Sequence, residues 1–117
     1  MTYDLAVWEG QRPASNAAGL EEYLRLIEWS EEEDGTPPTP AIAHYVEALL
    51  ARWPDIGEPG GEDSPWGDGP MLNNAIGSII YFSMVWSRAD EASAFASDLA
   101  AQHGLVCFDP QWETLRP

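Results

Sequence analysis

The sequence predicts a small single-domain α+β sandwich, with a three- to four-stranded mixed sheet and helices mainly on one face, of the ferredoxin-like or split βαβ type. Three observations support this class. Residues 2–9, "TYDLAVWE", alternate in polarity as a strand does, three later stretches repeat apolar residues at helical spacing, and residues 78–86 are almost continuously apolar. Because 117 residues suffice for one hydrophobic core and not for two, we expect one domain over residues 1–117.

The first strand and the first helix are predicted from periodicity. In residues 2–9 Tyr3, Leu5 and Val7 alternate with Asp4, Ala6 and Trp8, so the two sets face opposite sides of a strand. A helix then begins at Ser15 or Asn16, either of which can accept a hydrogen bond from the first free backbone N–H groups. Like charges, glycine and prolines in residues 30–40 oppose its continuation, so we expect the helix to end there.

A second helix has a clearer start, followed by an unusual loop. Thr39 is a favourable N-cap, and Pro40 fits the first helical position, where its missing N–H has no partner to lose. Pro54 ends the helix. Residues 54–70, "PDIGEPGGEDSPWGDGP", are acidic and rich in glycine and proline, and we expect a loop throughout.

The apolar centre of the chain comes next. Residues 71–77 favour a short strand or hairpin arm, with its turn at Asn73–Asn74 because asparagine tolerates a positive φ. Residues 78–86, "SIIYFSMVW", are rich in strand-forming side chains without polar alternation. This pattern indicates a central strand covered on both faces.

A third helix and a last strand complete the prediction. Ser87 with Asp90 resembles a capping box at the helix start, and Gly104 is a typical stop. The strand "LVCFDP" ends at Asp109–Pro110. A strand, a helix and a strand with short connections predict a right-handed parallel crossover.

The net charge of −15 limits the partners that this chain can have. Twenty acidic residues face five arginines, and there is no lysine. Such a surface repels phosphate backbones, so we expect no nucleic-acid partner. The same field attracts a basic protein or cations. The alternative, that the acidity only maintains solubility, stays open.

Membrane association and export are not expected. No apolar run approaches the ~20 residues that a bilayer-spanning helix needs, and the N-terminus lacks the pattern of a signal peptide. The single cysteine, Cys107, fits a reducing compartment. We therefore expect a soluble, cytoplasmic protein without a membrane partner.

Metal and cofactor motifs are weak in this sequence. An EF-hand starting at Asp63 fails because Pro65 and Gly67 occupy two of its ligand positions. A looser oxygen-ligand site from Glu62, Asp63 and Asp68 stays open. No zinc-type spacing, phosphate loop or dinucleotide fingerprint is found, so we expect no metal and no cofactor.

A catalytic site is the second functional possibility. His103, Cys107 and Asp109 lie close in sequence and supply an imidazole, a thiol and a carboxylate at the rim of an expected pocket. Yet a cysteine within an apolar strand is usually an inert small side chain. A histidine in the last turn of a helix is also favoured there by the helix dipole.

Tryptophans near acidic residues suggest a protein interface. Trp53 and Trp86 fit apolar core faces, whereas Trp29, Trp66 and Trp112 fall at a helix end, in a loop and in the C-terminal tail. An aromatic anchor supplies binding energy and acidic neighbours steer a basic partner. The predicted partner-binding residues are Trp29, Glu31, Glu32, Glu62, Asp63, Trp66, Asp68 and Trp112. Alternatively, each tryptophan folds back over the core edge.

Four segments carry a resemblance to known proteins: "YDLAVWEG", "SPWGDGP", "YFSMVWSRADEA" and "HGLVCFDPQ". In these the chain resembles a group of small, acidic actinobacterial proteins that has no known activity. More loosely, its size, acidity and C-terminal quarter are similar to those of immunity proteins from bacterial polymorphic-toxin systems. The resemblance implies a protein that acts by binding another protein, and no functional residues are transferred.

Together these observations favour a non-enzymatic protein-binding module. Its most plausible form is an immunity protein or inhibitor that occludes a basic toxin or enzyme domain, with Trp66 as the main anchor. The alternative is a small enzyme or ligand-binding domain with a pocket near His103, Cys107 and Asp109. A homodimer formed through a sheet edge is a third possibility.

Overall fold

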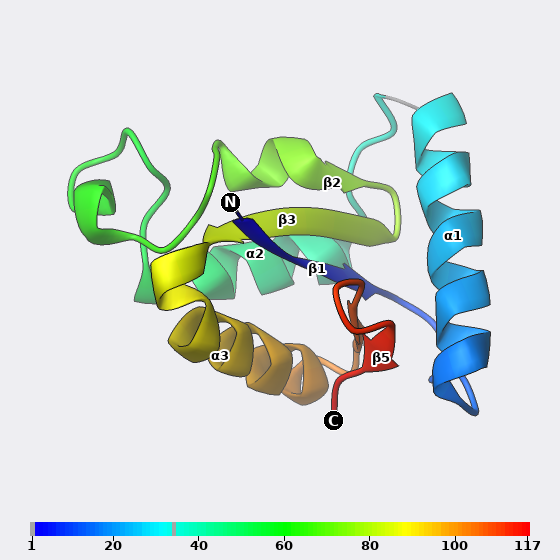
Figure 1. Cartoon of the computed structure of the whole chain (residues 1–117). Coiled ribbons are helices and arrows are strands. Elements are labelled where there is room, and N and C mark those ends of the chain that lie inside the picture. The colour runs from blue at the N-terminus through cyan, green and yellow to red at the C-terminus, as the bar shows by residue number, and fades with distance from the viewer. Residues whose placement is uncertain (1, 34) are drawn as a thin grey trace.

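Three α-helices and one five-stranded sheet make up the residues that the structure, a computed structural model, describes: 2–33 and 35–117 (Figure 1). The strands are β1 (Thr2–Trp8), β2 (Ala75–Ile76), β3 (Ile79–Val85), β4 (Val106–Asp109) and β5 (Thr114–Leu115). The helices are α1 (Asn16–Glu32), α2 (Pro40–Arg52) and α3 (Ala89–Gln102), with 3-10 turns η1 (Gly61–Asp63), η2 (Met71–Asn74) and η3 (Trp86–Arg88). The predicted α+β class is confirmed.

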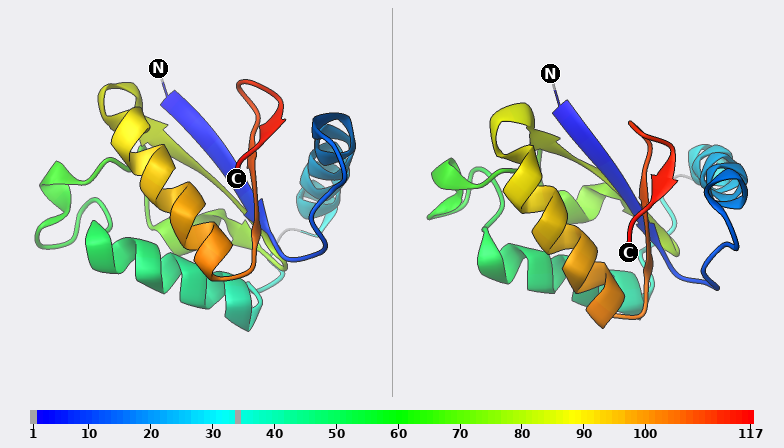
Figure 2. Two further views of the ribbon diagram at one scale, coloured as in Figure 1. Left: turned by 90° about the horizontal axis from the view of Figure 1, so that it is seen from below. Right: turned by 60° about the horizontal axis from the view of Figure 1, so that its bottom comes forward.

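Helices cover both faces of the sheet (Figure 2). Alternation along β1 decides which side chain faces which helix. Leu5 and Val7 pack in one cluster with α2 and α3, whereas Ala6 and Trp8 pack in a second cluster with α1. The prediction of helices mainly on one face therefore holds for α2 and α3, while α1 covers the opposite face.

The sheet differs from the predicted one in strand number and in pairing. Its order is β2-β3-β1-β4-β5, and every neighbouring pair is antiparallel. β3 and β4 do run parallel to each other, as the strand–helix–strand pattern predicts, but β1 lies between them. This is the split βαβ arrangement that the sequence predicts. The prediction of a mixed sheet with three to four strands is wrong, because the sheet has five strands and all its neighbouring pairs are antiparallel. Hydrophobic periodicity locates strands without giving their order, and the two-residue strands β2 and β5 are too short to show it.

The predicted helix ends are confirmed for the most part. Ser15 Oγ accepts a hydrogen bond from the Ala18 N–H at 3.1 Å, and Thr39 Oγ1 accepts one from the Ile42 N–H at 3.4 Å. The Ser87–Asp90 capping box is wrong. The turn η3 leads into α3, whose N-cap residue Arg88 makes no side-chain capping bond.

The hairpin between β2 and β3 turns at Gly77–Ser78 and not at the predicted Asn73–Asn74, which belong to η2. Gly77 has φ +58°, in the left-handed region that favours glycine. A Cβ added there would lie 2.6 Å from Cη2 of the Trp29 ring. Glycine is thus required both by the backbone and by the indole that α1 places over the turn.

We expect Gly77→Ala to lower the free energy of unfolding by about 2–3 kcal/mol, since the substitution combines an unfavourable φ with an overlap against a ring. Gly104→Ala is the matched control, because Gly104 has φ +69° but nothing within 4 Å of its added Cβ. It should cost only about 1 kcal/mol. Urea denaturation measures both values, and equal losses would show that the Trp29 contact does not matter.

Candidate functional site

The main predicted anchor, Trp66, is a core residue. It is 2% exposed, and its Nε1 donates a hydrogen bond to the Trp53 carbonyl at 2.8 Å. Two backbone hydrogen bonds flank Trp66 and hold the loop against the outer edge of β3. The Val85 N–H donates to the Pro65 carbonyl, and the Gly67 N–H donates to the Ser83 carbonyl. Trp66 then projects toward Trp53 and Phe82, both of which it meets edge-on. The prediction of an outward-facing Trp66 is therefore wrong, and the alternative that it folds back onto the core is confirmed.

The acidic residues around Trp66 stay at the surface. Glu62, Asp63 and Asp68 are exposed. Within residues 2–33 and 35–117 no three acidic, histidine or cysteine side chains gather closely enough to hold a metal ion. The open possibility of an oxygen-ligand site in this loop therefore gains no support from the geometry.

The predicted residues do not form one surface. Glu31 and Glu32 are exposed at the end of α1, and Trp29 is half-buried against Gly77. Figures 1 and 2 place α1 and the loop of residues 54–70 at opposite ends of the molecule. Trp112 belongs to neither segment and lies in the turn between β4 and β5.

A different set of aromatic side chains shares one surface, which we call the aromatic patch: Tyr3, Trp86 and Trp112. Trp112 is 74% exposed and Trp86 is 53% exposed. Tyr3 connects them, because its ring centroid lies 5.8 Å from that of Trp86 and it lines a pocket together with Trp112. The prediction of a core position for Trp86 is wrong, since β3 ends at Val85 and η3 starts with Trp86 at the surface.

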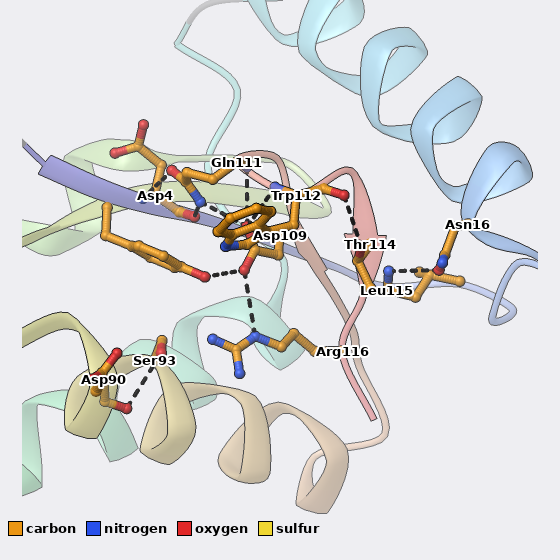
Figure 3. A network of polar contacts seen from close by, with 11 residues as sticks. Asp4, Asn16, Asp90, Ser93, Asp109, Gln111, Trp112, Thr114, Leu115 and Arg116 are labelled. Carbon is orange, nitrogen blue, oxygen red and sulfur yellow. Dashed lines mark hydrogen bonds and ion pairs between the residues drawn. The ribbon is translucent and has the colours of Figure 1, made fainter.

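Asp109 organises the backbone under this patch. It is 3% exposed, and its Oδ1 accepts bonds from Gln111 N–H at 3.0 Å, Gln111 Nε2 at 2.8 Å and Trp112 N–H at 3.3 Å (Figure 3). Its Oδ2 accepts the Tyr3 hydroxyl. Burial, the hydrogen bond to Asp109 and the charge of Asp109 raise the pKa of Tyr3 to about 12. The carboxylate thus fixes both the turn that carries Trp112 and the hydroxyl of Tyr3.

The Gln111 side chain takes the place of the backbone partner that Asp4 of β1 would find in β4 if that strand continued. The antiparallel register pairs Ala6 with Phe108, so two residues further along the ladder Asp4 lies opposite Pro110. Proline has no N–H to donate. The Gln111 carboxamide supplies both bonds instead, accepting from Asp4 N–H at 2.5 Å and donating to Asp4 C=O at 2.7 Å. This side chain anchors the turn to β1.

A pocket of about 410 Å³ opens beside the patch. It is lined by Tyr3, Asp109, Trp112, Thr114 and Arg116. The Arg116 Nε lies 3.7 Å from Asp109 Oδ2, so the two groups form an ion pair without a hydrogen bond. The sequence predicts Asp109 both at the end of a strand and at the rim of a pocket, and Asp109 does line this one, whereas no pattern points to Tyr3 or Arg116.

The predicted catalytic grouping is not formed. His103 is exposed just after α3, beside Tyr45, while Asp109 lies at the far end of β4 and faces Tyr3. Cys107 is 2% exposed, and burial raises the pKa of its thiol to about 12. A thiol that stays protonated and covered is a poor nucleophile. The pocket therefore contains one of the three residues, and the other two do not line it.

We expect the Cys107 thiol of the folded protein to be almost unreactive toward an aromatic disulfide reagent near neutral pH, and to react fully once the chain is unfolded in urea. Its raised pKa also has a consequence for stability. Below pH ~9 the thiol is protonated in both states; between pH ~9 and ~12 only the unfolded thiol ionises, so stability should fall. Rapid labelling without denaturant would contradict the observed burial.

No helix of the described residues is long and apolar enough to cross a bilayer. Searches against protein-family models, curated proteins and solved structures gave no match for this chain.

Proposed function

We propose that this chain is a non-enzymatic binding protein that uses the aromatic patch and its acidic surroundings to occlude a basic partner. The observation that carries this proposal is the exposure of two tryptophans, 74% at Trp112 and 53% at Trp86, on a chain with net charge −15. Exposed indoles are unfavourable in water and are typical centres of protein interfaces.

The rim of the patch carries exposed carboxylates. Asp90 and Glu91 follow shortly after Trp86, and Glu113 adjoins Trp112 in sequence. Only Glu91 of these pairs with an arginine among the described residues, through Arg88 at 2.7 Å. Unpaired surface carboxylates attract lysine and arginine of a partner and speed the encounter.

The partner class that fits best is a basic toxin or enzyme domain, and the chain would then act as its immunity protein or inhibitor. A patch of two indoles and a tyrosine can cover the partner's functional surface, while the rim acids pair with its cations. Such a mechanism needs no cofactor and no chemistry from this chain. It also agrees with the burial of Cys107 and the distance of His103 from the pocket.

A comparative capture experiment tests the proposal. The wild-type chain, a Trp86→Ala/Trp112→Ala variant and a Leu24→Ala control are used as bait in native lysate at low salt; Leu24 is 56% exposed on α1. We expect a basic protein that is retained by wild type and by the control and is lost from the double variant. Equal retention by all three chains would contradict the proposal. So would a wild-type dimer, detected by light scattering, that the double variant dissolves, because a second copy would then cover the patch.

A further inference from the structure

A separate pocket, of about 440 Å³, lies between α1 and the β2–β3 hairpin, on the face of the sheet that α1 covers. Figure 1 shows α1 standing beside that hairpin, whose turn lies against the ring of Trp29. Eight residues line the pocket, and none of them is arginine, lysine or histidine: Tyr23, Ile27, Ser30, Glu31, Asn73, Asn74, Ile76 and Tyr81. The lining shares no residue with the aromatic patch.

The hydroxyl hydrogens of two lining residues are already used within the chain. Ser30 Oγ donates to the Ile27 carbonyl at 2.7 Å, and the Tyr81 hydroxyl donates to Asp4 Oδ2 at 2.8 Å. A hydroxyl oxygen that donates its one hydrogen keeps lone pairs that can accept. Toward a ligand these two groups are therefore acceptors.

The carboxamides and the one carboxylate of the lining add further acceptor oxygens. Asn74 Nδ2 donates to Asp68 Oδ1 at 3.2 Å, which leaves the Asn74 carboxamide oxygen for another donor. Asn73 is exposed on η2 beside it. The Glu31 carboxylate is exposed and forms no ion pair with the residues that the structure describes. The pocket thus presents several oxygen acceptors and one negative charge.

The remaining walls are aromatic and aliphatic. The rings of Tyr23 and Tyr81 stack with their centroids 6.3 Å apart, and Ile27 and Ile76 complete the lining. An ammonium group carries three N–H donors, no acceptor and a positive charge, so it complements the oxygens. Aromatic rings attract cations as well, and the apolar walls fit the hydrocarbon part of an amine.

We infer that this pocket binds a protonated primary amine, with Glu31 as the charged acceptor and the tyrosine and isoleucine walls against its apolar body. The inference goes beyond the proposed function, because the pocket lies outside the aromatic patch and stands whether or not a partner covers that patch. The ammonium group can belong to a free amine or to a lysine side chain, since both present the same three donors.

Titration with 2-phenylethylamine at neutral pH tests the inference, with 2-phenylethanol as the uncharged control of similar shape. The readout is the set of backbone N–H signals of Asn73, Asn74 and Ile76 in an assigned proton–nitrogen correlation spectrum. We expect saturable shifts with a Kd on the order of 1 mM, because one charged contact and one ring give modest affinity. The alcohol should bind at least about tenfold more weakly.

Three exposed variants locate the site without disturbing the core. Glu31→Gln should weaken binding of the amine about fivefold, as expected for loss of an exposed charge pair. Glu32→Gln is the matched control, because it removes the same net charge from the neighbouring exposed residue, which does not line the pocket. It should change the Kd less than about twofold. Asn73→Asp adds a carboxylate of the same shape to the lining and should tighten binding about threefold.

Three results would overturn the inference: equal binding of the amine and the alcohol, an effect of Glu31→Gln no larger than that of Glu32→Gln, or the absence of saturable shifts at the pocket. The two glutamate variants have the same net charge, so attraction to the acidic chain as a whole affects both equally. A difference between them therefore reports on the pocket itself.

A pair of peptides distinguishes the two sources of the ammonium group. Both have blocked ends; one contains a single lysine, and the other carries N-acetyl-lysine at the same position. Tighter binding of the lysine peptide than of 2-phenylethylamine, lost on acetylation, assigns the pocket to lysine side chains. Binding of the lysine peptide no tighter than that of the amine assigns it to free amines. Both results support the pocket, whereas equal binding of the acetylated peptide contradicts it.

Discussion

Replacing Trp66 with alanine is expected to lower the free energy of unfolding by about 3–5 kcal/mol, as removal of a large buried ring does. The ring is 2% exposed, lies against Trp53 and Phe82, and donates a hydrogen bond to the Trp53 carbonyl. Its removal leaves a large cavity between the loop of residues 54–70 and the α2/α3 face of the sheet. Urea denaturation followed by circular dichroism measures the change.

Two further substitutions serve as comparisons. One separates the stability that comes from packing of the ring from that of its hydrogen bond, and the other removes an exposed ring instead of a buried one. Trp66→Phe keeps much of the buried area but leaves the Trp53 carbonyl without its donor, and should cost about 1–2 kcal/mol. Trp112→Ala removes a ring that is 74% exposed and should change stability by less than about 0.5 kcal/mol. If Trp66→Ala were as mild as Trp112→Ala, the loop would not be packed as described.

Replacing Asp109 with asparagine is expected to cost about 2–4 kcal/mol, because an amide nitrogen cannot accept a hydrogen bond and the charge of Arg116 loses its partner. The carboxylate of Asp109 is 3% exposed and accepts four hydrogen bonds. One oxygen of the new amide can keep either the turn donors or Tyr3, but not both. The same denaturation measurement gives the value.

Asp90→Asn is the control for this substitution, since Asp90 is an exposed carboxylate at the start of α3. We expect a change below about 0.5 kcal/mol there, reflecting only the loss of a favourable charge near a helix N-terminus. The turn itself can be followed through the indole signal of Trp112, which should shift strongly in Asp109→Asn. A stable variant with an unshifted signal would mean that Asp109 does not organise the turn.

Local features of this fold could be predicted from the sequence because they depend on neighbouring residues. Ser15 and Thr39 cap helices through bonds to residues three positions away, and the alternation in β1 sets its two faces. The order of the strands could not be predicted in this way. It depends on β1 inserting between β3 and β4, which is a matter of tertiary packing and leaves no period in the sequence.

The candidate site was harder to predict for the same reason. Tyr3 and Asp109 are 106 positions apart and meet only because β1 and β4 are neighbours. Trp66 is surrounded in sequence by acidic residues, glycines and prolines, which suggested an exposed loop. Its backbone pairing with β3 reverses that expectation. Trp112 was predicted at the surface and lies there, whereas its partners in the aromatic patch come from the other end of the chain and from η3.

The association rate of the captured partner, measured against ionic strength, tests the proposed function most directly. Between about 50 and about 500 mM salt we expect the on-rate to fall at least tenfold, since screening removes the attraction between this acidic chain and a basic partner. Trp112→Ala should leave the on-rate nearly unchanged and raise the off-rate about tenfold or more, because the ring acts only after contact. An on-rate that does not change with salt, together with an unchanged off-rate in Trp112→Ala, would contradict a steered interface centred on the aromatic patch.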